Sequence, residues 1–285
     1  NLVVGATGLL GGEICRLLSA KGKPVRALVR PTADKARIEK LRSLGVELVQ
    51  GDLKDRPSLD GACRGVTTVI STAATTISRQ PGDTIQKVEQ EGQISLIDAA
   101  RAAAVSHFIY ISYSGNIKFD DPLTTAKRTV EQHVQRSGLV YTILRPSMFM
   151  EIWLSPAVGF DFVNAKAMIY GKGQNIISWI SLTDVAKFAV ESLDDPAARN
   201  KIIELGGPEA LSPLEVVKIF EELGGRKFEV QLVPEEALTS VAQKISAADD
   251  LQRAFAALLQ TYAKGDSIDM RATLQTFPLQ LTSVR

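Results

Sequence analysis

Short apolar runs alternate with amphipathic stretches through the first half of the chain. The runs are brief, rich in β-branched residues and bounded by polar or glycine positions, which is typical of buried strands. We expect strands at 2–4, 25–29, 46–49, 68–71, 107–111 and 141–144. Between them, apolar residues recur at helical spacing and predict helices near 12–20, 33–43, 57–63, 84–104 and 123–136. Strands that alternate with helices indicate an α/β fold with a doubly wound parallel sheet.

The second half of the chain has a less regular pattern. A helix is expected at 183–193 and a strand at 201–205, and the rest, to about 275, is mostly helical. Ser212, Pro213 and Glu215 have the spacing of a helix start with a capping box. We expect one domain from 1–150 and about 175–205, and a smaller, mostly helical lobe for substrate or partner from 151–174 and 206–285.

A glycine-rich turn follows the first apolar run directly. The segment reads Gly5-Ala-Thr7-Gly8-Leu9-Leu10-Gly11-Gly12 and opens a helical pattern. This context, strand then glycines then helix, is the dinucleotide-binding turn of a Rossmann-type sheet. The glycines allow a tight turn, and the helix N-terminus presents free N–H groups to a pyrophosphate. The alternative is a glycine-rich loop that binds nothing.

The end of the second expected strand indicates which dinucleotide binds. An acidic residue there would favour NAD(H), whereas this chain has Arg30, followed by Thr32. A guanidinium pairs well with a phosphate, so the sequence favours NADP(H) over NAD(H), with Arg30 at the 2′-phosphate. The alternative is that Arg30 is a solvated loop residue.

Ligands of a parallel sheet sit beyond the carboxyl ends of its strands, so the residues there are the candidate contacts. Asp52 can accept a hydrogen bond from the adenine amine, or it can cap a short turn. We expect the cofactor also to contact Leu53, Thr72, Ala73, Ala74, Ser112, Pro146, Ser147, Met148 and Phe149. Trp153, Phe160 and Tyr170 either line a hydrophobic substrate cleft or pack between the lobes.

Composition argues against nucleic-acid binding, a metal site and a membrane span, but it does not identify the function. The 285 residues are 45% hydrophobic and 23% charged, with a formal net charge of +1, so no strong field favours nucleic acid. Two cysteines and two histidines form no metal-ligand pattern, and we expect both histidines to be structural. No run is long enough to span a membrane. The chain opens almost inside a strand, so we expect its natural start to lie upstream, and a cytoplasmic or organelle-stroma location.

The motifs together resemble the NmrA-like, atypical branch of the short-chain dehydrogenase/reductase superfamily, which includes isoflavone-reductase-like and quinone-reductase-like members. Beyond the glycine turn and Arg30, the resemblance rests on four further motifs. They are 51–53 (GDL), 127–131 (KRTVE), 141–146 (YTILRP) and 184–186 (DVA). It implies an NADP-binding Rossmann fold. Members include NADPH-dependent reductases, redox sensors and organelle assembly factors.

The resemblance also exposes a departure in the catalytic pair. Superfamily enzymes use Tyr-x-x-x-Lys, whose lysine matches Lys127 here, but the tyrosine position holds Leu123. Leu123 cannot transfer a proton, so we expect Tyr113 or Lys127 to assist in catalysis. Lys127 shares a helical face with apolar residues; it contacts the nicotinamide ribose or, alternatively, forms a structural pair with Glu131.

Three functions remain open at this point. The first is an NADPH-dependent reductase of an apolar carbonyl, quinone or enone. The second is a non-catalytic NADP(H)-binding sensor or assembly factor that acts through a protein partner, and the third is a nucleotide-sugar epimerase or dehydratase. We expect a monomer or homodimer that contacts a small apolar substrate or a protein partner, not nucleic acid.

Overall fold

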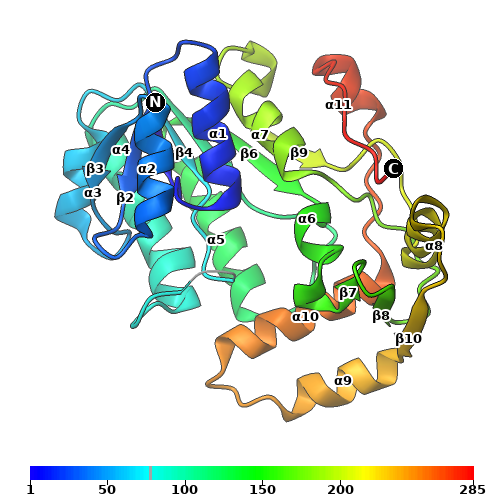
Figure 1. Cartoon of the computed structure of the whole chain (residues 1–285). Coiled ribbons are helices and arrows are strands. Elements are labelled where there is room, and N and C mark those ends of the chain that lie inside the picture. The colour runs from blue at the N-terminus through cyan, green and yellow to red at the C-terminus, as the bar shows by residue number, and fades with distance from the viewer. Residues whose placement is uncertain (77–78) are drawn as a thin grey trace. The chain divides into compact units, whose positions relative to one another are not determined.

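The computed structural model describes residues 1–76 and 79–285 (Figure 1). Contacts between Cα atoms divide the chain into two compact units. The first unit comprises Asn1–Ser112, Thr125–Leu144 and Val185–Ile203, and the second comprises Tyr113–Thr124, Arg145–Asp184 and Glu204–Arg285. The second unit thus includes 113–124, 145–150, 175–184 and 204–205, which we expected in the dinucleotide domain. The division of function between domains stays a prediction.

A seven-stranded sheet carries the strands expected from the apolar runs. Its order is β3-β2-β1-β4-β5-β6-β9, and the five pairings from β3 to β6 are parallel. The strands are β1 (Leu2–Val4), β2 (Arg26–Val29), β3 (Glu47–Gln50), β4 (Thr68–Ser71), β5 (His107–Ile111), β6 (Val140–Pro146) and β9 (Lys201–Leu205). The order reverses direction between β1 and β4, so this sheet has the switch point at which Rossmann-type folds bind ligands. The expected fold class is confirmed.

Helices connect these strands as the sequence pattern predicts. They are α1 (Leu9–Ala20), α2 (Lys35–Ser43), α3 (Arg56–Cys63), α4 (Gln93–Ala102), α5 (Pro122–Arg136) and α7 (Leu182–Glu191). The expected helix at 84–104 is in two parts, because a π-helix, η1 (Ile85–Gly92), runs directly into α4. None of the helices formed by the described residues is long and apolar enough to cross a lipid bilayer.

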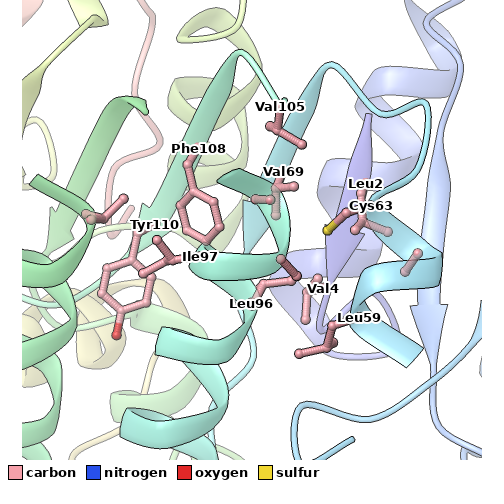
Figure 2. Packing of buried hydrophobic residues seen from close by; sticks show 14 of the residues in the cluster. Leu2, Val4, Leu59, Cys63, Val69, Leu96, Ile97, Val105, Phe108 and Tyr110 are labelled. Carbon is pink, nitrogen blue, oxygen red and sulfur yellow. The ribbon is translucent and has the colours of Figure 1, made fainter. Parts of the chain in front are cut away.

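One face of the large sheet is packed by α3, α4 and α5 (Figure 2). Alternate strand residues such as Leu2, Val4, Phe108 and Tyr110 meet apolar helix residues such as Leu96 in a single buried cluster. The two-residue period of the strands explains why one set of side chains enters this core. The packing fixes the carboxyl ends of β1, β4 and β5 relative to one another.

The second unit contains a small sheet that the apolar pattern did not predict. Its order is β10-β8-β7, from β7 (Phe160–Asp161), β8 (Lys166–Tyr170) and β10 (Glu229–Val233). Its helices are α6 (Met150–Trp153), α8 (Pro213–Gly224), α9 (Glu235–Lys244), α10 (Asp250–Lys264) and α11 (Arg271–Thr276); the 3-10 turns η2 (Pro156–Val158) and η3 (Pro196–Ala198) complete the chain. The expected capping box of α8 is present, with Ser212 and Glu215 bonded reciprocally.

The aromatic residues 153, 160 and 170 belong to the core of this second unit. Trp153 stacks on Tyr262 with ring centroids 5.5 Å apart, and Tyr170 meets the same ring edge-on. Phe160 is 2% exposed and packs edge-on against Phe220. These contacts lie within the second unit, and a role in lining a substrate cleft stays a prediction.

Candidate functional site

The glycine turn after β1 has a backbone that only glycine fits at two positions. Gly5 has a φ of 87°, and a Cβ atom there would lie 2.7 Å from the Ala73 nitrogen. A Cβ at Gly11 would lie 2.3 Å from the Gly5 carbonyl oxygen. The turn closes through a 2.9 Å hydrogen bond from Gly8 N–H to the Gly5 carbonyl. The motif therefore brings α1 against the end of β1 more closely than any side chain allows.

The N-terminus of α1 is open to an anion. Gly8 is the N-cap, and within this fully described segment it gives the helix no side-chain hydrogen bond, nor is there an acidic residue in the first turn. The first N–H groups of a helix lack intrahelical acceptors and carry a partial positive charge. This donor set fits a pyrophosphate, which the resemblance implies as the ligand.

The segment after β4 lies against the glycine turn. The Thr72 N–H and hydroxyl both donate to the Val4 carbonyl, at 2.9 and 3.1 Å. Gln93 of α4 holds the same segment from the other side: its amide donates to the Ala73 carbonyl at 3.2 Å, and it accepts from Ser71 at 2.7 Å. Thr72 and Ala73 thus lie against the glycine turn at the switch point, as expected of a common ligand site, and Ala74 beside them is exposed.

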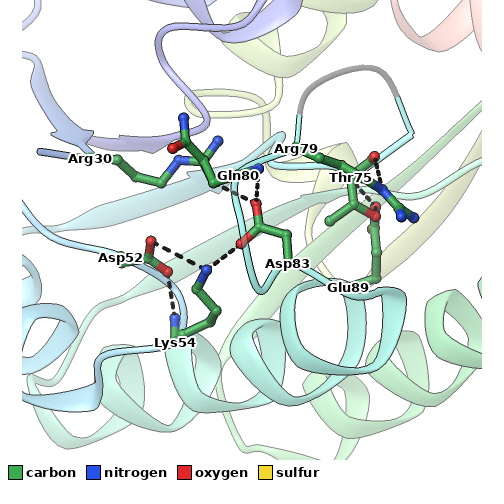
Figure 3. Close-up of polar contacts among 8 residues, drawn as sticks. All are labelled: Arg30, Asp52, Lys54, Thr75, Arg79, Gln80, Asp83 and Glu89. Carbon is green, nitrogen blue, oxygen red and sulfur yellow. Dashed lines mark hydrogen bonds and ion pairs between the residues drawn. The ribbon is translucent and has the colours of Figure 1, made fainter. Parts of the chain in front are cut away.

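Arg30 belongs to a charged cluster that the sequence did not reveal (Figure 3). Its guanidinium donates to Asp83 at 2.7 Å, and the Lys54 ammonium pairs with the same carboxylate. The Asp83 side chain is 1% exposed, whereas those of Arg30 and Lys54 are 29% and 27% exposed. Burial alone would raise the pKa of Asp83, but hydrogen bonds from Lys54, the Gln80 amide and Arg30 outweigh it and lower that pKa. Arg30 is thus neither free in solvent nor fully enclosed.

Two neighbours of this cluster were predicted to contact the cofactor. Asp52 accepts from the Lys54 amide at 2.9 Å, which is the turn-capping role considered for it. The buried Leu53 packs in the same core as α3 and α4. Thr32 is exposed in the segment after β2. Their contacts with adenine and ribose stay predictions.

Lys127 is a buried cation in an ion pair. Its side chain is 6% exposed, and Nζ lies 3.0 Å from Oε2 of Glu89, whose side chain is fully buried. Nζ also lies 3.5 Å from the carbonyl oxygen of Ile111, the last residue of β5. Glu131, the partner considered from the sequence, forms an ion pair with Arg128 at 2.6 Å. The lysine ammonium is therefore at the carboxyl end of β5.

Leu123, at the position of the missing tyrosine, is 2% exposed. Tyr113, in the loop after β5, shares a 2.6 Å hydrogen bond with the Thr124 hydroxyl. Because the Thr124 hydroxyl itself donates to Asp121, the tyrosine is the donor in this arrangement. The Ser112 hydroxyl, in the first unit, accepts from Arg128 at 3.3 Å.

The residues after β6 are anchored within the second unit. The Ser147 hydroxyl donates to the buried carboxylate of Asp266 at 2.7 Å, which also accepts from Ser114 at 2.6 Å. Pro146 ends β6, Met148 is 4% exposed and Phe149 precedes α6. Their contact with the nicotinamide stays a prediction.

Sequence reasoning missed the polar residues that hold the predicted contacts in place: Lys54, Asp83, Glu89 and Gln93. Glu89 and Gln93 could have been noticed, because they are four residues apart and so share a helical face with apolar residues, where a polar side chain is unusual. Lys54 and Asp83 gave none, because they pair with residues far along the chain.

The two histidines lie within hydrogen-bond distance of neighbouring side chains, and the two cysteines are buried. His107 Nε2 lies 2.9 Å from the Thr142 hydroxyl, and burial, aided by Arg199, lowers the pKa of His107 to about 4. Nε2 of His133 lies 3.0 Å from Asp98. Burial raises the pKa of Cys15 to about 12 and that of Cys63 to about 11, so neither thiol ionises near neutral pH.

Comparison with known proteins agrees with this geometry. The NmrA-like family matches residues 2–281. An NAD(P)H azoreductase of Xenophilus azovorans is 31% identical over 270 residues, covering 93% of this chain and 89% of the relative. The photosystem II assembly factor Ycf39 of Trieres chinensis is 31% identical over 243 residues, covering 85% of this chain and 74% of the relative.

Among solved structures, the NADPH-dependent quinone oxidoreductase QOR2 of Escherichia coli, complexed with NADPH, has the same fold. Its TM-score is 0.78 at 23% identity, covering 99% of this chain and 96% of the other. A match across nearly the whole chain, together with a Rossmann-type sheet and its glycine turn, shows that this chain belongs to the NmrA-like family of NAD(P)-binding proteins.

Proposed function

We propose that this protein is an NADPH-dependent reductase of an apolar carbonyl, quinone or enone. One observation carries the proposal. The glycine turn, the 72–74 segment and the Lys127 ammonium lie at the carboxyl ends of β1, β4 and β5, three strands adjacent in the sheet. A dinucleotide crossing these strand ends would meet an anion site first and a buried cation last. The NAD(P)H azoreductase and the quinone oxidoreductase support the reaction class by their names.

Each residue then has a role set by its chemistry. The N–H groups at the start of α1 bind the pyrophosphate. Arg30 and Lys54 bind the 2′-phosphate through their exposed sides, while Asp83 holds them from the buried side. When bound, NADPH supplies the hydride, and the chain supplies binding, orientation and a proton.

Two residues are candidates for the proton. Lys127 holds protons on a buried ammonium at the end of β5 and also orients the ribose hydroxyls. Tyr113 holds its proton on a hydroxyl that is already hydrogen-bonded to Thr124. The buried Leu123 takes no part in the proton transfer.

The proposal is tested by NADPH oxidation with a panel of quinones and phenolic enones. We expect turnover with at least one member, a large loss in Lys127→Met, and a loss in kcat in Tyr113→Phe if the phenol gives the proton. Lys40→Met, at an exposed lysine of α2, is the matched control and should behave as wild type. Tight NADPH binding without turnover across the panel would overturn the reductase proposal.

A second candidate is a non-catalytic NADP(H)-binding assembly factor that acts through a protein partner. Leu123 in place of the tyrosine favours it, and so does the similarity to Ycf39. A ligand shifts a conformation only by its differential affinity, so a sensor requires clearly different affinities for NADP+ and NADPH. Equal affinities, together with turnover, would exclude this candidate.

A further inference from the structure

A single buried carboxylate connects two parts of the candidate site. Glu89 Oε1 accepts from the Thr75 amide at 2.6 Å and from the Thr75 hydroxyl at 3.1 Å (Figure 3). Its other oxygen, Oε2, lies 3.0 Å from the Lys127 ammonium. Thr75 directly follows the 72–74 segment, so Glu89 contacts both that segment and the lysine at the end of β5.

This arrangement is costly for the fold. Both charged groups are removed from water, which repays the fold only when the geometry and the remaining hydrogen bonds are good. The Tyr110 hydroxyl is also buried, and Lys127 Nζ lies 5.2 Å from the centre of the Tyr110 ring. A buried ion pair is weak evidence for stability, so its presence here calls for an explanation beyond stability.

The helix that carries Glu89 is irregular where the carboxylate is needed. Glu89 lies on the π-helix η1. π-Helices are rare in proteins as a whole, but those that occur are often at functional sites. The junction with α4 packs tightly, since a Cβ at Gly92 would lie 2.8 Å from the Leu53 Cβ. Gln93, the next residue, holds the Ala73 carbonyl. The η1–α4 junction therefore forms hydrogen bonds to the 72–75 segment through two side chains, Glu89 and Gln93.

We propose that Glu89 is a positioning residue for the nicotinamide end of the dinucleotide, acting through Lys127. The carboxylate fixes the ammonium at the end of β5, and it ties the lysine to the segment against which the cofactor lies. Removing the charge of Glu89 takes away a 3.0 Å ion pair from a buried ammonium, so the lysine is held less firmly in its place. This inference rests on the proposed function.

The test is a double-mutant cycle read by NADPH dissociation constants and by kcat. Glu89→Gln keeps the size and the oxygen acceptor for Thr75, removes the charge and places an amide NH2 where Oε2 faces Lys127. We expect NADPH affinity to fall by about tenfold in Glu89→Gln and in Lys127→Met, with kcat also reduced. In Lys127→Met, adding Glu89→Gln should change affinity by less than about twofold, because the two residues act as a unit.

Asp98→Asn is the matched control, since it removes another carboxylate that faces α5, through His133, away from the 72–75 segment. It should leave the NADPH dissociation constant unchanged. If Glu89→Gln does not fold, Glu89→Asp keeps the charge and withdraws it by one methylene, and it should weaken NADPH in the same direction.

Three outcomes separate the claims. Wild-type affinity in Glu89→Gln would overturn the inference while the proposed function stands. A loss that persists fully in the Lys127→Met background would overturn it as well, because Glu89 would then act through the fold rather than the lysine. No NADPH binding by the wild type would instead overturn the proposed function.

Discussion

At the residue scale, the cations of this site take their counter-ions from distant parts of the chain. Arg30 and Lys54 share the Asp83 carboxylate, and Lys127 pairs with Glu89. In the first group the carboxylate is buried and the cations are partly exposed, so their outer faces can meet a phosphate. Because the carboxylate contacts both cations from the buried side, it holds them in place and leaves part of each cation accessible to a ligand.

Arg30 should therefore determine cofactor preference. Arg30→Gln removes the charge-assisted contact that we propose with the 2′-phosphate, so NADPH affinity should fall roughly tenfold while NADH affinity changes little. Equilibrium titration with both dinucleotides measures this. Arg42→Gln, at an exposed arginine of α2 paired with Glu39, is the matched control. An equal loss of affinity for both dinucleotides would contradict the assignment of Arg30 to the 2′-phosphate.

His107 should make the fold sensitive to acid. Its pKa is lowered from 6.5 to about 4 by burial and Arg199, so the unfolded chain binds a proton in that range that the folded chain does not. Stability is then lost as pH falls from about 6.5 towards 4. Between pH 7 and pH 5 the histidine should cost about 2 kcal/mol.

Denaturant unfolding of wild type and His107→Gln at the two pH values measures this term. The Gln amide replaces the Nε2 donor to Thr142, so folding at pH 7 should be retained. The wild type should lose about 2 kcal/mol more than the variant on acidification. Identical losses would show that His107 is not held neutral.

At the element scale, the start of α1 depends on one glycine and not on its neighbour. A Cβ at Gly11 would lie 2.3 Å from the Gly5 oxygen, whereas one at Gly12 would lie 3.4 Å from the Ala6 oxygen, an ordinary contact. Gly11→Ala should cost roughly 1–3 kcal/mol and abolish NADPH binding. Gly12→Ala should be neutral or stabilise by up to about 1 kcal/mol through helix propensity.

Thermal unfolding and NADPH titration of the two alanine variants make the comparison. They add the same methyl group one residue apart on the same helix, so each is the control for the other. Similar behaviour of both variants would mean that the close approach of α1 to the turn is not required.

The elements that the sequence predicted share a local signal. β1, β4 and β5 were predicted residue for residue, because each is an apolar run buried on both faces of a parallel sheet. The start of α1 at Leu9 rather than at 12 was missed, because Leu9 is 61% exposed and two of the next three residues are glycines. The Ser212 capping box was readable because it is local.

The elements that the sequence missed depend on distant partners. β10 pairs with β8, which lies more than fifty residues earlier in the chain. Its first four residues alternate polar and apolar side chains, but Val230 and Leu232 are 37% and 50% exposed, so this face enters no buried core. The π-helix η1 could not be told from an α-helix, because apolar residues at helical spacing predict a helix without giving its hydrogen-bond pattern. Such features become visible only when the contacts are known.

At the scale of the whole molecule, the candidate site likewise combines residues that local motifs predict with residues whose role depends on distant contacts. The rule that ligands lie beyond parallel strand ends predicted Thr72, whereas the strand–glycine–helix motif predicted the glycine turn and the family resemblance predicted Lys127. Asp83, which pairs with Arg30 and Lys54, and Glu89, which pairs with Lys127, come from the stretch between β4 and α4 and were invisible to that rule. The sequence thus predicts where a ligand binds better than it predicts what fixes the binding residues.

The central claim, that the first unit binds NADP(H) at the glycine turn, is tested most directly by titrating the purified chain with NADPH and with NADH. We predict saturable binding of NADPH with one site per chain, at least about tenfold tighter than NADH. No saturable NADPH binding, or equal affinities for the two dinucleotides, would contradict the account.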